Sequence, residues 1–244
     1  MAWGRVSLLV QNLLAAGLVL AMPVQAEEVR SLSPYSAGAI VDLPAKGELS
    51  EAVSSLVESY GVFVGFGSNN APELRAKLNL TRADLLQWLS GAADRSMQMA
   101  DSLGPEQLKR LPLLRTPICA GSGWQAVSDV QSVTEVDASA PWAEAMTNLV
   151  DRYGAAVVPA NRKAAPLLAV TVAQAQACLA SFAPDLRLPG KKSAPISRGD
   201  FMIVLARALD IHAQQTALLA EEAERQQIAE RQARQNPGAG SVDK

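Results

Sequence analysis

Two segments of the chain repeat one helical pattern of apolar and polar positions. The first reads "ELSEAVSSLVESYG" (48–61) and the second reads "PWAEAMTNLVDRYG" (141–154). In both segments apolar residues recur at i, i+3, i+4, i+7, i+8 and i+11, the pattern of a helix that buries one face. Gly61 and Gly154 stand where a helix end favours a left-handed residue. The pattern therefore predicts two copies of one amphipathic helix.

A second helical pattern occurs three times, over residues 80–94, 170–184 and 196–210. Each copy opens on a hydroxyl residue that is followed three positions later by a carboxyl or amide residue, which is the signature of a capping box. The three boxes are Thr81 with Asp84, Thr171 with Gln174, and Ser197 with Asp200. A short apolar segment, "VFVGF" (62–66) or "AAVV" (155–158), and a polar loop separate the two kinds of helix. Each unit is predicted to be helix, loop, helix, and the last copy lacks its own first helix.

This order of motifs resembles the S-layer homology repeat. The matching residues are "SDV" (128–130), "WAEAM" (142–146), "YGVFVGF" (60–66), "LTRAD" (80–84) and "ISRGDF" (196–201). The forms "LVESYG" and "LVDRYG" are similar to the variant found in cyanobacterial outer-membrane porins and related envelope proteins. The resemblance covers most of residues 48–210. It departs from the family after Phe66, where the Tyr-Pro-Asp-Gly loop is missing, and at Val172, which replaces an arginine.

The resemblance implies an exported protein of the cell envelope that binds an acidic polysaccharide linked to peptidoglycan. No porin barrel is expected after the repeats, because the residues that follow lack alternating strands. The alternative is a periplasmic scaffold, in which degenerate repeats have lost glycan binding and dock on a membrane complex.

Arginine directly follows the capping residue in two of the three copies, at Arg82 and Arg198. A cation at a helix start opposes the macrodipole by a few tenths of a kcal/mol up to about 1 kcal/mol, so helix formation does not require it. A guanidinium beside free backbone amides can instead hold a carboxylate. The resemblance implies the same role, since S-layer homology repeats bind glycans that often carry a pyruvyl ketal carboxylate. The candidate ligand-binding residues are Arg82, Arg198, Thr81 and Ser197. The alternative is that each arginine pairs with the acid of its own capping box.

The pattern divides the chain into seven segments. Residues 1–26 are interpreted as a signal peptide, because Arg5 precedes the apolar run 13–22 and small residues precede Glu27. A membrane anchor is the alternative, although Gln11 and Asn12 break the apolar stretch. The other segments are an N-terminal extension (27–47), repeat 1 (48–94), a linker (95–127), repeat 2 with the extra half-repeat (128–210), a C-terminal helix (211–235) and a disordered tail (236–244). The expected location is the periplasm, in association with the cell wall or outer membrane.

Composition defines the fold class and excludes some partners. The 244 residues are 49% hydrophobic and 19% charged, with a formal net charge of −2. We therefore expect a mostly α protein whose repeats pack as a small helical bundle, followed by a polar C-terminal helix. The negative net charge gives no electrostatic reason to expect a nucleic acid. Leu218 and Ile228 do not sustain a heptad, so the last helix is interpreted as solvated, with a docking arm for an envelope protein as the alternative.

Patterns for catalysis and metal binding are scarce. His212 is the single histidine, and the chain has no CxxC motif or phosphate-binding loop, so we expect no enzyme activity, no cofactor and no metal site. A glycosidase would need only two acids, but no pattern brings two together in a cleft. The two cysteines, Cys119 and Cys178, are an even pair that an oxidising compartment would allow to bridge. Two separately buried thiols are the alternative.

Tryptophans are further candidates, because aromatic faces stack on sugar rings. Trp142 lies on the apolar stripe beside Met146, which favours a place in the core. Trp88, directly after Gln87, and Trp124, in a loop of small residues, are considered for exposed positions.

The signal-peptide interpretation predicts that the mature protein begins at Glu27. Intact-mass measurement of protein recovered from an exporting host checks this prediction. An uncleaved N-terminus would contradict it and favour the membrane anchor.

Overall fold

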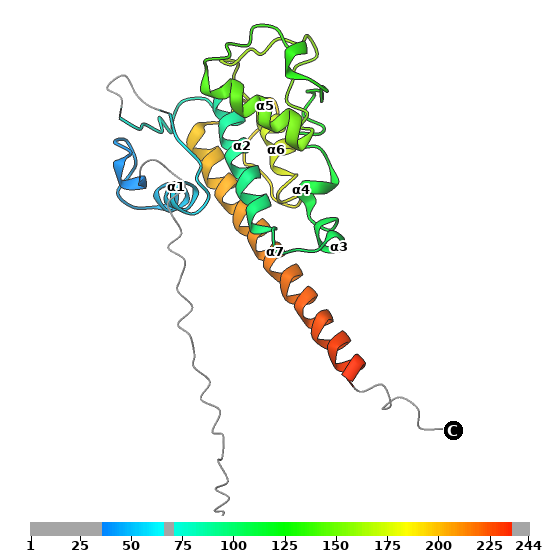
Figure 1. Ribbon diagram of the computed structural model, residues 1–244. Coiled ribbons are helices and arrows are strands. Elements are labelled where there is room, and N and C mark those ends of the chain that lie inside the picture. Colours follow the sequence, from blue (N-terminus) through cyan, green and yellow to red (C-terminus); the bar gives the residue numbers. More distant parts are fainter. Residues whose placement is uncertain (1–35, 66–70, 236–244) are drawn as a thin grey trace, which may run out of the picture. The chain divides into compact units, whose positions relative to one another are not determined.

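The computed structural model describes residues 36–65 and 71–235, and this part of the chain is mostly helical (Figure 1). The α-helices are α1 (Glu48–Glu58), α2 (Arg82–Met99), α3 (Pro105–Leu108), α4 (Pro112–Arg115), α5 (Pro141–Tyr153), α6 (Val172–Leu179) and α7 (Arg198–Gln235). Two short 3-10 turns lie at Ala37–Ala39 and Val130–Ser132. Within these ranges the extended residues form only isolated β-bridges. The expected class, a mostly α protein with a long C-terminal helix, is confirmed. The predicted signal peptide and disordered tail lie outside the described residues.

The helix ends follow the capping signals. Thr81 and Thr171 each accept a hydrogen bond from the third residue of the helix, whose side chain in turn accepts from the backbone amide of the threonine. The hydroxyl of Ser197 accepts from the amide of Asp200 in the same way. At the other end of α5, Gly154 adopts a left-handed conformation with φ 58°, which lets the amide of Ala155 reach back to Leu149. Local sequence therefore defines where each of these helices begins or ends.

The starts of α2, α6 and α7 meet in a closed triangle of backbone hydrogen bonds. The amide of Leu80 donates to Ile196 (2.8 Å), that of Ile196 to Val170 (3.0 Å), and that of Val170 to Leu80 (2.9 Å). Antiparallel bridges extend the three contacts to Asn79 with Ser197, Thr81 with Ala169, and Thr171 with Pro195. All three corner side chains are buried. The three copies thus have an approximate threefold arrangement, which we call the central triangle.

Each first helix packs on the second helix of another copy. α5, from repeat 2, lies against α2 of repeat 1, and α1, from repeat 1, lies against α7 of the half-repeat (Figure 1). The same polar contact marks both pairs: Tyr153 donates to Asp94 (2.7 Å) and Tyr60 donates to Asp210 (2.8 Å). Burial, followed by the hydrogen bond to the carboxylate, raises the pKa of both phenols above the ordinary value. The repeats are therefore interlocked rather than stacked as separate units.

In the described part of the chain, α6 has no such first helix against it, and it is the shortest of the three second helices. The pattern predicts a helix as far as residue 184, but α6 ends at Leu179. The chain that follows folds back over α6, where Gln176 donates to the carbonyl of Leu186 and accepts from the amide of Leu188. The missing first helix of the last copy thus explains the early end of α6, because a loop takes the place of a packing partner.

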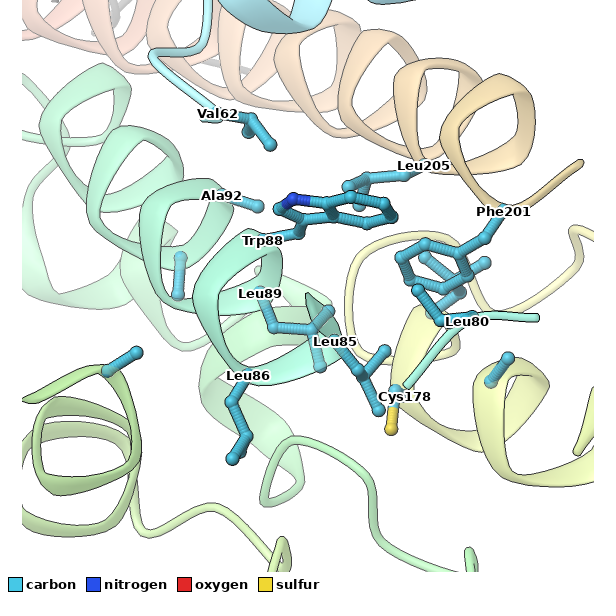
Figure 2. Close-up of a cluster of buried hydrophobic side chains, with 14 of the residues drawn as sticks. Val62, Leu80, Leu85, Leu86, Trp88, Leu89, Ala92, Cys178, Phe201 and Leu205 are labelled. Carbon is cyan, nitrogen blue, oxygen red and sulfur yellow. The ribbon is translucent and has the colours of Figure 1, made fainter. Parts of the chain in front are cut away.

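Side chains from all three second helices form the core (Figure 2). Trp88 of α2 is 2% exposed and stacks on Phe201 of α7, with ring centroids 6.0 Å apart. The outward position considered for Trp88 is therefore wrong, whereas the core position expected for Trp142 is confirmed. On α6, Cys178 occupies the position equivalent to Trp88 and forms a disulfide with Cys119 of the linker. The disulfide joins the linker to the core beneath the central triangle.

α7 is one continuous helix from Arg198 to Gln235. The boundary drawn at Asp210 between the repeat and the C-terminal helix is therefore not a structural break, since residues 211–235 include strong helix formers and no glycine or proline. Part of the linker supports α7: Leu103 and Leu111 pack with Leu219 in a small second cluster. Beyond this cluster the described side chains from Glu224 to Gln235 are exposed.

The single histidine lies inside this structure. His212 on α7 is 0% exposed, with its ring edge-on to Phe182 at 6.2 Å. Burial lowers the pKa of the imidazole to about 4, and a contact with the backbone of Ser96 offsets only part of this effect. The folded protein therefore holds His212 neutral at pH 7.

This burial predicts that the protein loses stability in mild acid. The unfolded imidazole titrates near pH 6.5, so between about pH 6.5 and pH 4 the unfolded chain binds a proton that the folded chain does not. The contribution of His212 should be complete above pH 6.5 and should fall by about 2–3 kcal/mol on lowering the pH to 4.5. Urea unfolding at both pH values measures this loss. The variant His212→Leu retains every carboxylate and should show a smaller loss. An equal loss in both proteins would contradict the assignment.

Candidate functional site

The backbone amides of the three helix starts are already hydrogen-bonded within the protein. The amides of Arg82 and Ala83 donate to the carbonyls of Leu168 and Pro166, which belong to the loop before α6. The α6 start is closed in the same way by Ala194 and Lys192, and the α7 start by Leu78 and Ala76. Each loop thus caps the helix of a neighbouring copy. The free amides that an anion site requires are not present at these three positions.

Arg82 is buried, although arginine is rarely found inside proteins without a partner. The residue is 1% exposed, and its guanidinium donates to the carbonyls of Ala164 and Val157. The half-buried ring of Trp124 lies 5.1 Å from the guanidinium carbon. Burial lowers the pKa of Arg82 to about 10, so the group remains charged at neutral pH. Arg82 therefore connects α2 to two segments of repeat 2, and its contacts are internal.

Arg198 is held by an acid of another copy. Its Nε and Nη2 atoms donate to the two carboxylate oxygens of Asp84, at 2.9 and 2.8 Å. The two side chains are only 17% and 13% exposed. The Asp84 carboxylate also accepts a hydrogen bond from the backbone amide of Thr81. One carboxylate therefore completes a capping box and neutralises a guanidinium. Arg198 thus joins the start of α7 to the start of α2.

These contacts show where the structure places the four candidate residues of the anion site that the sequence predicts. Arg82 faces inward, and the hydroxyl of Thr81 is occupied by capping. Arg198 pairs with Asp84 of a neighbouring copy instead of its own Asp200. Of the four candidates, Ser197 lies in the lining of the cavity beside the start of α7. The sequence analysis treated each helix start as an isolated element, and the other copies that occupy its donors are visible only in the folded chain.

The cavity beside the start of α7 is the best candidate for a binding site. It has a volume of about 680 Å³, within the range of small-molecule sites. Its walls come from the segment before α1, the loop before α2, and the first turns of α7. The charged and hydroxyl residues in the lining are Asp42, Arg75, Lys77, Ser197 and Asp200. Leu49, Leu78 and Ile203 supply apolar surface.

The polar groups of this cavity differ in how firmly they are held. Asp42 accepts the amides of Leu74 and Arg75, at 2.7 and 2.6 Å, which fixes the loop. Lys77 is exposed and has no ion-pair partner among residues 36–65 and 71–235. Gly199 lies at the base, where a Cβ atom would approach the carbonyl of Ala76 to 3.2 Å. The cavity thus has one cation without an ion-pair partner in the described residues, Lys77, beside a loop that Asp42 holds in place.

Other chemistry finds little support in the described residues. They contain no group of three or more metal-ligating side chains. None of the helices placed by the structure is long and apolar enough to cross a membrane. Comparison with known proteins found no matching family model, no matching curated protein and no matching solved structure.

The internal roles of Arg82 and Arg198 predict that both stabilise the fold. Arg82→Gln should cost about 1–3 kcal/mol, because two buried carbonyls lose their donors. Arg198→Gln should cost a similar amount, because Asp84 is left with a partly buried unpaired charge. Relief of the helix dipole opposes these losses by at most about 1 kcal/mol. Denaturant unfolding measures the free energy of each variant.

Arg152 is a matched control, because it forms an ion pair with Asp94 while its own side chain is 62% exposed. Arg152→Gln should cost less than about 1 kcal/mol. If Arg82→Gln were no more destabilising than Arg152→Gln, the internal role of Arg82 would be contradicted.

Proposed function

We propose that this protein is an exported, non-catalytic component of a cell envelope that binds acidic polysaccharide linked to peptidoglycan. The proposal combines the resemblance of the repeats to S-layer homology repeats with a cavity formed between copies. The single observation that carries it is this cavity, because it joins a loop of the first copy to the helix start of the last copy.

The chemistry of the cavity fits a sugar acid. Lys77 offers a point charge for a carboxylate, while Asp200, whose carboxylate accepts the hydroxyl of Ser197 at 2.7 Å, offers its remaining lone pairs to sugar hydroxyls. Leu78 and Ile203 can contact the apolar C–H surface of a sugar ring. Arg82 and Arg198 support the site indirectly in this proposal, since they hold together the helix starts from which it is built.

A second candidate function is a periplasmic scaffold that meets a partner protein through α7. The end of α7 favours this candidate, because its described side chains are exposed from Glu224 onward and have no packing partner in the described part of the chain. A helix of this length, polar on all sides, is typical of segments that bridge to another component. In this case the repeats would serve only to support the helix.

Co-sedimentation with purified sacculi separates the two functions. The chain beginning at Glu27 should pellet with sacculi that retain their polysaccharide, and should stay in solution after acid has stripped it. Lys77→Gln should weaken pelleting about tenfold, because the carboxylate loses its charged partner. Added salt should weaken the parent in the same direction.

Lys109→Gln is the control variant, because Lys109 is 70% exposed in a surface ion pair outside the cavity. This variant should pellet as the parent does. Equal pelleting of parent and Lys77→Gln would contradict the cavity as the glycan site. Failure of the parent to pellet with intact sacculi would contradict glycan binding and favour the scaffold.

A further inference from the structure

We propose that the loops before α6 and α7 dock the protein on an anionic lipid surface. The residues that carry this inference are Arg162, Leu167, Leu168, Lys191 and Lys192, which we call the leucine–lysine patch. The inference goes beyond the proposed function and does not depend on it.

The central triangle brings these two loops to the same end of the repeat assembly. The loop before α6 covers the start of α2, through the carbonyls of Pro166 and Leu168. The loop before α7 covers the start of α6, through the carbonyls of Lys192 and Ala194. Because the helix starts are joined directly to one another, the two loops lie side by side around the triangle.

The two leucines of the patch are not packed against the rest of the described structure. Leu167 is 84% exposed and Leu168 is 54% exposed, although their neighbours Ala164 and Val170 are buried. The backbone is held rigidly here, since the carbonyl of Leu168 accepts from Arg82 and its amide donates to Ala165. The loop therefore presents two adjacent leucines to solvent in a fixed conformation.

The cations of the patch carry no internal role. The side chains of Arg162, Lys191 and Lys192 are exposed and make no ion pair within the described residues. Lys163, by contrast, pairs with Glu135 at 2.7 Å. Three unpaired cations and two exposed leucines thus lie on the two loops of the patch.

An anionic bilayer surface is the partner that matches both features. Lysine and arginine side chains are attracted to anionic headgroups, and leucines enter the boundary between headgroups and acyl chains. An acidic glycan would use the cations but would gain little from aliphatic leucines. None of the five patch residues belongs to the lining of the cavity described above, so the patch and the cavity are separate surfaces.

Sedimentation with sucrose-loaded vesicles tests the inference. The chain beginning at Glu27 retains all the packing described above and is mixed with vesicles of phosphatidylcholine that contain about one third phosphatidylglycerol. We expect binding to these vesicles at low salt, weaker binding at high salt, and little binding to phosphatidylcholine alone. Leu167→Ser with Leu168→Ser should lower the partition coefficient about tenfold or more. Lys191→Gln with Lys192→Gln should lower it to a similar extent on anionic vesicles only.

Leu218→Ser is the matched control, because Leu218 is 61% exposed on α7, about five helical turns beyond the start of that helix. It should bind vesicles as the parent does, and circular dichroism confirms that each variant is folded. No binding of the parent to anionic vesicles, or an equal loss in Leu218→Ser, would overturn the inference. If the leucine variant instead lost pelleting with sacculi while vesicle binding was unchanged, the patch would belong to a glycan site and the lipid surface would be excluded.

Discussion

Three backbone hydrogen bonds among Leu80, Val170 and Ile196 are the constraint on which the rest of the structure depends. Each residue gives its amide to one neighbour and its carbonyl to the other, so the three copies close on themselves without forming a sheet. These groups are buried, and breaking one contact would leave a donor and an acceptor without partners. The triangle therefore sets the position of each loop over the next helix start, and with it the place of every candidate binding residue.

Closing the triangle explains why two arginines follow capping residues. The loops occupy the helix-start amides, and the guanidiniums extend away from them to reach Ala164 and Val157 in one case and Asp84 in the other. In the middle copy the same position holds Val172, which is buried. Its side chain lies close to Gly190, since a Cβ atom added to that glycine would be 3.5 Å from Val172 Cγ2. Relative to Arg82 and Arg198, Val172 thus replaces a polar connection with an apolar one.

Interlocking of the copies also decides where surfaces remain open. α1 covers α7 and α5 covers α2. Over α6 the residues that the structure describes place a loop instead of a first helix, and this loop is held by Gln176. As a result, the equivalent loops before α2, α6 and α7 have different surroundings. The loop before α2 forms a wall of the cavity with Lys77 and Leu78, whereas the loop before α6 exposes Leu167 and Leu168 outside that cavity. Repeats with the same backbone conformation can in this way present different side chains on their surfaces.

The sequence by itself determined the helices, because capping boxes and the period of apolar residues act within a few neighbouring positions. It also indicated the repeats and the pair of cysteines that the structure joins. Only the tertiary structure decided that first helices pack on other copies, that Trp88 is buried and that Arg82 and Arg198 are occupied. The physical reason is that these residues are satisfied by groups about 75 to 115 positions away, and no local pattern records which distant carbonyl or carboxylate will be nearest.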